Sequence, residues 1–359
     1  MLSKNIGGVV LVGKTKTQIS FVLQHVILVV SFIYFFFLIA WAPTYIEKHQ
    51  VFGRGEPKNV LIATGETGKT VAEKLSKEGL VDDPEGLIFW MVKLSIDRSI
   101  KPGIYRIKPG SPWEVAKQLQ TSKPFTEKVT LYPGKTYREI QEYFKNNYNE
   151  DFSNVLKKKG AFYPSVRDIL PERAEDRIVF LLPDTYYVIP GESYASQAVK
   201  AASEAWYKRV GSVIGQSNLN KDHLLKIATV ASLVEKETAL EEEKKTIAGV
   251  IYNRLSKSMP LQVDATVVYA WGEKGIKLNR VLYKHLKIES SYNTYLVKGL
   301  PPGPICIPSI GSWMAAIFPE KHSYLFYVAK EDGSHIFSES YKEHLKAIKV
   351  NKKNKQDSK

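Results

Sequence analysis

The sequence predicts a mixed α+β protein with a membrane-spanning helix near its N-terminus. Three observations predict this class: an apolar run over residues 21–42, three strand-turn-helix units between residues 60 and 144, and two helical apolar periods between residues 220 and 256. The chain has 359 residues, of which 44% are hydrophobic, and can therefore bury a core and divide into two or three domains.

The N-terminal apolar run is long enough to cross a bilayer as a helix, because about 20 such residues span the hydrocarbon core. Residues 1–20 contain three lysines and no acidic residue, whereas the other flank mixes both charges. We therefore expect a cytoplasmic N-terminus, a single membrane span over 21–42, and an exported remainder. A cleaved signal peptide is the alternative, because Ala40-Trp41-Ala42 matches a cleavage site. Either outcome exports the rest of the chain.

The charge balance indicates an anionic neighbour. The formal net charge is +14, which suits nucleic acid, a membrane surface or an acidic polymer such as cell wall, or simply a soluble surface without a specific ligand. Export disfavours nucleic acid. The single Cys306 excludes an intramolecular disulfide, and no Cys/His cluster has zinc-site spacing, so we expect no metal and no cofactor. The basic segment 351–359 lacks an apolar period and is predicted to be a disordered tail.

Three short units after a linker over 43–56 share one pattern of strand, glycine turn and helix. The strands are expected over 60–62, 103–107 and 129–132, each followed by a glycine and a Ser or Thr that can cap the next helix. The turn Gly65-Glu-Thr-Gly-Lys-Thr70 resembles the end of a phosphate-binding loop but lacks its first glycine, which excludes a nucleotide site there.

Two consecutive helices are predicted in the second half of the chain. Asn220 offers an N-cap for the first, and Thr238-Ala-Leu-Glu241 has capping-box spacing for the second. The break between them falls just after Glu237. Glu241, Glu242 and Glu243 then lie in a first helical turn, where acidic side chains complement the helix dipole, and receive no catalytic role.

Glu235 and Glu237 lie about 200° apart on a helical wheel, so they cannot serve one site. Glu237 continues the apolar stripe of Val230, Leu233 and Val234. Burial there would raise the pKa of its carboxyl and keep it protonated, as a general acid requires. The alternative is that Glu237 pairs with a lysine or caps a backbone group.

Polar residues downstream could bind a sugar. Gln262 and Asp264 suit hydrogen bonds to hydroxyl groups, although Asp264 could equally cap the next helix. Tyr292-Asn-Thr-Tyr295 adds aromatic and amide groups. Asp332-Gly333 predicts a β-hairpin, on which His335 is expected to be a surface residue rather than a base.

Five motifs together resemble the MltG (YceG-like) endolytic murein transglycosylases. They are Val234-Glu-Lys-Glu-Thr238, Tyr252-Asn-Arg-Leu255, Leu261-Gln-Val-Asp-Ala-Thr-Val267, Tyr292-Asn-Thr-Tyr295 and Gly299-Leu-Pro-Pro-Gly-Pro304. The resemblance extends from about residue 57 to His344 and implies one N-terminal span, a LysM-like subdomain over 57–125 and a catalytic domain over 126–350.

The resemblance also implies an activity. Members cleave the MurNAc-GlcNAc bond of nascent glycan strands and leave 1,6-anhydro-MurNAc ends, with the residue matching Glu237 acting first as acid and then as base. The matching groove residues are Gln262, Asp264, Asn293 and Tyr295. Expected partners are peptidoglycan glycan strands and cell-wall synthesis proteins. Two alternatives remain open at this point: a muramidase-type hydrolase that uses Glu237 plus Asp264, and a non-catalytic peptidoglycan-binding scaffold.

Overall fold

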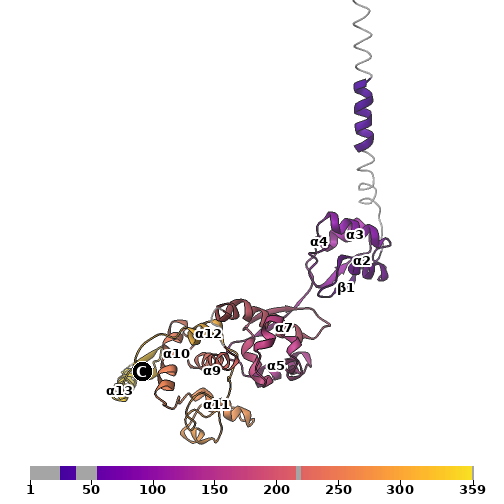
Figure 1. Cartoon of the computed structure of the whole chain (residues 1–359). Helices are drawn as coiled ribbons and strands as arrows, with labels where there is room; N and C mark the ends of the chain where they lie inside the picture. Colours follow the sequence, from indigo (N-terminus) through magenta and orange to yellow (C-terminus); the bar gives the residue numbers. More distant parts are fainter. Residues whose placement is uncertain (1–24, 38–54, 216–219, 358–359) are drawn as a thin grey trace, which may run out of the picture. The chain divides into compact units, whose positions relative to one another are not determined.

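The computed structural model describes residues 25–37, 55–215 and 220–357, and the chain divides into two compact units, 1–125 and 126–359 (Figure 1). Residues 25–37 are helical. Within the described residues, no helix combines the length and the apolar character that a membrane crossing needs. The predicted span over 21–42, the linker over 43–56 and the N-terminal segment 1–20 lie partly or wholly outside the described residues. They therefore stay predictions.

Residues 55–125 of the first unit form a two-stranded sheet with three helices. Strands β1 and β2 pair antiparallel, with Val60 opposite Tyr105. The buried side chains of α2, α3 and α4, including Leu75, Leu87 and Val115, share one core with the inward face of this sheet. The elements are β1 (Lys58–Ile62), α2 (Gly68–Lys77), α3 (Pro84–Lys93), β2 (Gly103–Ile107) and α4 (Pro112–Thr121).

Hydroxyl caps begin the helices of all three predicted strand-turn-helix units. Thr67, Ser111 and Thr136 each accept a hydrogen bond from the backbone N–H three residues later, in a complete capping box. Gly65 and Gly134 have positive φ in the turns, a conformation that glycine adopts without steric cost. The three units are thus confirmed, and the capping box at Thr67 and Thr70 gives the 65–70 turn a structural purpose.

The second unit combines two separate two-stranded sheets with a helical core. Strand β3 pairs antiparallel with β4, and β5 with β6. The strands are β3 (Glu127–Leu131), β4 (Asp184–Val188), β5 (Phe326–Ala329) and β6 (His335–Ser338). The helices are α5 (Tyr137–Tyr148), α6 (Phe152–Lys157), α7 (Tyr194–Trp206), α8 (Ser212–Ile214), α9 (Lys221–Glu237), α10 (Glu241–Ser256), α11 (Asp264–Glu273), α12 (Ile310–Ile317) and α13 (Tyr341–Asp357). Short helical turns are η1 (Lys159–Ala161), η2 (Pro164–Ile169), η3 (Ala174–Phe180), η4 (Tyr207–Gly211) and η6 (Tyr283–Lys287). These elements confirm the mixed α+β class.

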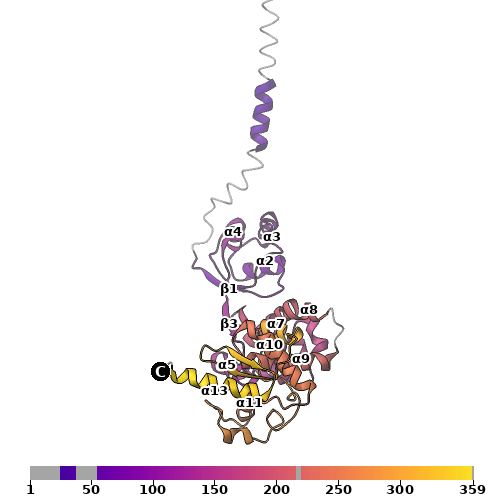
Figure 2. The same ribbon diagram turned by 90° about the vertical axis from the view of Figure 1, so that its left-hand side faces the viewer.

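Helix α9 packs against α10, α11 and α12, whose labels surround it in Figure 1, and Figure 2 shows it beside α10 in a second view. Nine of its residues are buried, including the unbroken run 227–234. Trp206 and Trp313 pack edge to face beside it, with ring centroids 5.4 Å apart. A helix enclosed in this way holds its last turn in a fixed position, and Glu237 is its last residue.

The chain leaves α9 by a sharp break. Asn220 accepts a hydrogen bond from the His223 N–H at the predicted N-cap, and α9 ends at Glu237 as predicted. The predicted capping box for α10 is wrong: the N-cap position is Leu240, which makes no side-chain cap. The Thr238 hydroxyl instead accepts from the Leu240 N–H at 3.0 Å and shapes the connection over 238–240.

The C-terminal region differs from the prediction at its end. The hairpin at Asp332-Gly333 is confirmed, with Gly333 at φ +83°. Residues 351–357, predicted to be a disordered tail, continue α13. The packed first turns of α13 against β5 and β6 nucleate the helix, and Lys, Gln and Asn can extend an existing helix at low cost.

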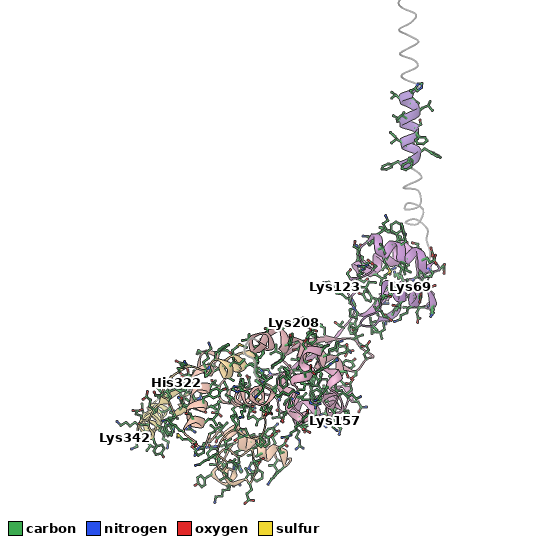
Figure 3. All side chains as sticks on the ribbon, in the orientation of Figure 1. Lys69, Lys123, Lys157, Lys208, His322 and Lys342 are labelled. Carbon is green, nitrogen blue, oxygen red and sulfur yellow. The ribbon has the colours of Figure 1, made fainter. Side chains whose placement is uncertain are left out.

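The basic charge is spread over the molecule. Lys69 and Lys123 lie on the first unit, and Lys157, Lys208 and Lys342 lie on separate parts of the second (Figure 3). Each of these lysines is exposed. No single element carries the excess charge.

Candidate active site

The carboxyl of Glu237 meets the hairpin at the C-terminal end of α9. The Tyr327 hydroxyl, from β5, donates a 2.6 Å hydrogen bond to Glu237 Oε2. Glu237 is only partly exposed, and the protein atoms packed around its carboxyl replace most of its hydrating water. One oxygen is thus engaged by a phenol.

The surroundings raise the pKa of Glu237 above its ordinary value. Desolvation is the largest cause, and the negative charge of Asp264 acts in the same direction. The Tyr327 hydrogen bond and the charges of His335 and Arg254 oppose the rise without cancelling it. A carboxyl of this kind holds its proton at a higher pH than an exposed glutamate does, which is the property of a general acid.

Arg254, near the end of α10, fixes the hairpin beside Glu237. Its guanidinium donates to the Leu325 carbonyl at 2.6 Å and to the Leu261 carbonyl at 2.7 Å, and it lies over the Phe326 ring at 5.3 Å. All these contacts use carbonyl oxygens or a ring face. The charge of Arg254 therefore lowers the pKa of Glu237 through space, without forming an ion pair with its carboxylate.

Glu243 holds the second strand of the hairpin. Its two carboxylate oxygens accept from the His335 backbone N–H at 2.9 Å and from His335 Nδ1 at 2.6 Å. The His335 ring packs edge to face on Tyr327, with centroids 5.4 Å apart. The expectation of a surface histidine is wrong, because the His335 side chain is only 7% exposed. Its pairing with Glu243 orients the ring against Tyr327.

A second pair lies on the loop side of the site. The Tyr295 hydroxyl donates to Asp264 Oδ1 at 2.5 Å. Desolvation, this hydrogen bond and the charges of Asp264 and Glu237 all raise the pKa of Tyr295. The charge of Asp264 raises the pKa of Glu237, and the charge of Glu237 raises the pKa of Tyr295. We therefore treat the two carboxylate-phenol pairs as one site. Asp264 is exposed and begins α11 as its first residue, so it is not the N-cap.

Gln262 and Asn293 have different places. Gln262 is exposed, has a left-handed φ of +54°, and donates its backbone N–H to the Thr294 carbonyl. Asn293 is fully buried. Its amide donates to the Leu286 and Ile288 carbonyls, and its oxygen accepts from the Tyr295 N–H. The structure therefore does not bring the Asn293 side chain to the groove predicted for it. It holds the loop that carries Tyr295.

Glu235 points away from this site, as the helical wheel predicted. Its Oε2 accepts from the Ser309 N–H at 2.9 Å and from the hydroxyls of Ser309 and Ser312 at 2.5 and 2.6 Å. Lys244 Nζ lies 3.7 Å away and is 4% exposed. Glu235 thus ties the end of α9 to the first turn of α12.

Sequence reasoning did not find Tyr327, Arg254 or Glu243. A weak signal existed for each: Tyr327 lies on the predicted hairpin, Arg254 within a quoted motif, and Glu243 in the first turn of α10. Their contacts with the site join residues 71 to 92 positions apart in sequence. Within the described part of the chain, no group of three or more His, Cys, Asp or Glu side chains could hold a metal ion.

The chain is similar to several known proteins. The sequence model of the YceG-like family matches residues 60–350. An endolytic murein transglycosylase of Bacillus subtilis is 31% identical over 306 residues, which cover 80% of this chain and 83% of that protein. One of Streptococcus pneumoniae is 31% identical over 298 residues, and the match spans about half of that longer protein, 53%. A solved structure of a yceG-like protein from Listeria monocytogenes is 28% identical, covers 81% of this chain and 99% of that one, and has a TM-score of 0.48.

Proposed function

Because this chain belongs to the YceG-like family, we propose that it is an endolytic peptidoglycan lytic transglycosylase with Glu237 as its catalytic residue. The observation that carries the assignment is the raised pKa of a partly exposed glutamate that ends a buried helix and accepts a hydrogen bond from Tyr327. The substrate is the glycan strand of peptidoglycan, cut between MurNAc and GlcNAc.

The first step is proton donation. Glu237 Oε2 accepts from Tyr327, so the proton of the neutral carboxyl belongs on Oε1. Oε1 gives this proton to the glycosidic oxygen, the bond from that oxygen to the muramyl C1 breaks, and the bonding electrons leave with the GlcNAc hydroxyl. The charges of Arg254 and His335 favour the carboxylate that forms.

The second step returns the proton. The muramyl C6 hydroxyl oxygen bonds to C1, and its proton passes to the Glu237 carboxylate. The product is a 1,6-anhydro muramyl end, no water is consumed, and the acid is regenerated. One carboxyl therefore suffices for both proton transfers.

We assign the binding of sugar hydroxyls beside Glu237 to three other residues that are exposed or partly exposed. Asp264 and Gln262 are exposed, and the Tyr295 hydroxyl is oriented by Asp264. We assign to Asn293 a positioning role, because its polar atoms are engaged by backbone groups.

The wider setting follows from the sequence. We propose that residues 21–42 anchor the protein in the cytoplasmic membrane, that the catalytic unit acts outside it, and that residues 57–125 form a LysM-like unit. Nascent glycan and the proteins that synthesise it would be the neighbours of an enzyme held there.

The chemistry of the products tests the proposal. The full chain would be incubated with purified peptidoglycan strands, and the fragments analysed by mass spectrometry. We expect anhydro-muramyl ends, which weigh one water less than hydrolysis products. Their absence, with strands left intact, would refute the assigned reaction.

A muramidase-type hydrolase is the second candidate, because Asp264 lies close enough to influence Glu237 and could activate water as a second carboxylate. Reducing muramyl ends, with incorporation of ¹⁸O from labelled water, would establish that reaction instead. The binding of Asp264 Oδ1 to Tyr295 favours a role in substrate orientation.

A further inference from the structure

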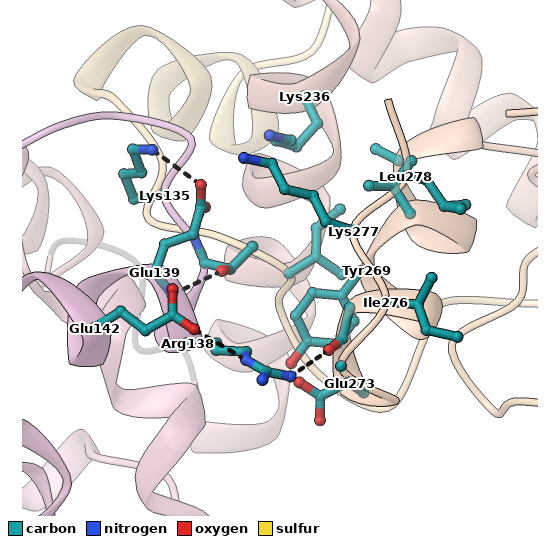
Figure 4. A pocket seen from close by; sticks show the side chains of 16 residues that line it. Lys135, Arg138, Glu139, Glu142, Lys236, Tyr269, Glu273, Ile276, Lys277 and Leu278 are labelled. Carbon is teal, nitrogen blue, oxygen red and sulfur yellow. Dashed lines mark hydrogen bonds and ion pairs between the residues drawn. The ribbon is translucent and has the colours of Figure 1, made fainter. Parts of the chain in front are cut away.

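A cavity of about 490 Å³ lies between α5 and α11, beside the end of α9 (Figure 4). The proposed reaction does not use it. Its wall contains four cationic side chains, from Lys135, Arg138, Lys236 and Lys277. This density of positive charge raises the question of which of these groups are free to bind a ligand.

Two of the four cations are already paired. Lys135 Nζ lies 2.9 Å from Glu139, and Arg138 lies 3.2 Å from Glu142 while also donating to the Gly272 carbonyl at 2.7 Å. These ion pairs neutralise the α5 side of the cavity.

Lys236 and Lys277 are not neutralised. In the parts of the chain that the structure describes, neither forms an ion pair with a carboxylate, and Lys236 Nζ has only the Gly134 carbonyl at 3.3 Å. Figure 4 shows both ammonium groups at the same end of the cavity, whereas Glu273 lies at the other end beside Arg138. Two like charges so placed repel each other and attract an anion between them.

The cavity also has an apolar wall, beside the carboxylates of Glu139, Glu142 and Glu273. Val268, Tyr269, Leu278 and Ile305 line it, and Ile276 adds a side chain that is 46% exposed. A cationic end over an apolar wall fits a small organic carboxylate better than it fits an inorganic ion or a neutral sugar.

Two residues of the cavity wall are neighbours in sequence of residues of the candidate active site. Lys236 directly precedes Glu237, and Ala265, in the cavity wall, directly follows Asp264. The muramyl sugar next to the cleaved bond carries a lactyl group whose carboxyl is linked to a short peptide with free carboxylates. Because each extended residue spans about 3.3–3.6 Å, this peptide can extend well beyond the sugar that carries it.

We propose that this cavity is a subsite for the peptide carried by the muramyl sugar, with Lys236 and Lys277 binding one of its carboxylates. The inference rests on the proposed function for its substrate. It extends that function, because the enzyme would then bind the peptide as well as the glycan.

Binding to a non-cleaving variant tests the subsite without requiring turnover. In the full chain carrying Glu237→Gln, calorimetry would compare a muramyl disaccharide with its peptide against the same disaccharide without it. Adding Lys277→Gln should weaken binding of the peptide-bearing ligand about tenfold, and should change the ratio of the two affinities by the same factor. Lys277→Arg, which keeps the positive charge, should retain most of the affinity for the peptide-bearing ligand. Lys145→Gln, an exposed change on α5 outside the cavity, is the matched control.

Equal affinities of the two disaccharides for the Glu237→Gln protein would overturn the subsite, and so would a ratio unchanged by Lys277→Gln and by Lys236→Gln. Because this assay does not measure cleavage, either result would leave the reaction assigned to Glu237 standing. Conversely, hydrolytic products in the strand assay would change the reaction and leave the peptide subsite intact.

Discussion

Two glutamates leave the last turn of α9 on opposite faces and meet different surroundings. Glu235 accepts hydrogen bonds from one backbone N–H and two hydroxyls and lies near Lys244. Glu237 accepts one hydrogen bond, from Tyr327, and lies near a second acid, Asp264. The same side chain, two positions apart, is held by three donors in one place, whereas in the other it is desolvated and its pKa is raised.

The difference shows that two residues in one helical turn can have separate roles, one in packing and the other in the chemistry of the site. The face that carries Glu235 joins α12, with three donors within 2.9 Å. The face that carries Glu237 adjoins the hairpin and the exposed Asp264. Substitutions on the two faces should therefore affect different properties.

The largest effect is expected from Glu237→Gln. Removing the only group assigned to proton transfer should lower the rate of strand cleavage by about 10³-fold, within the range for general acid-base residues. Timed release of anhydro-muramyl fragments measures this rate, and thermal unfolding serves as the control for folding. If Glu237→Gln retained more than a tenth of the wild-type rate, another residue would have to be the acid.

Glu235→Gln should instead lower stability. The amide loses the negative charge that faces three donors. The buried Lys244 then keeps Glu241 and the Ser309 hydroxyl but loses a second carboxylate, so the free energy of unfolding should fall by about 2 kcal/mol. Urea unfolding measures it, with the exposed Glu242→Gln as the matched control. Wild-type stability combined with lost cleavage would reverse the roles given to the two faces.

The smallest effect is expected from Tyr327→Phe. Loss of the hydroxyl removes a hydrogen bond that lowers the pKa of Glu237, so that pKa should rise and the alkaline limb of the kcat/KM profile should move to higher pH. The carboxylate formed in the first step also loses its donor, which should cost about tenfold in rate at the optimum. Tyr324→Phe, on the segment leading into the same strand, is the comparison. An alkaline limb that stayed in place or moved to lower pH would show that Tyr327 does not lower the pKa of the catalytic acid.

Local sequence patterns predicted much of the fold. The strand-turn-helix units followed from glycine turns and hydroxyl caps within a few residues, and the end of α9 followed from its apolar period. Helix α3 was missed although Asp83 caps it and Pro84 begins it. Its apolar run 87–92 has no clear polar face, so periodicity gave little signal.

The site itself was harder to predict. The orientation of Glu237 came from helical geometry, but its partner Tyr327 lies 90 residues away, and no local rule places a hairpin against a helix end. Asn293 was expected in the groove because it matches a motif position of the family that the sequence resembles. The sequence does not reveal that the carbonyls of Leu286 and Ile288 would engage that amide first.

The raised pKa of Glu237 links folding to proton uptake. In the unfolded chain this carboxyl titrates at its ordinary value, whereas in the folded protein it holds its proton to higher pH. Between those two values the chain must take up a proton as it folds, and the folded state loses stability as pH rises through the folded value. Calorimetric unfolding in buffers with different ionisation heats would register that proton. A cell wall kept acidic would thus favour both the fold and the protonated acid on which cleavage depends.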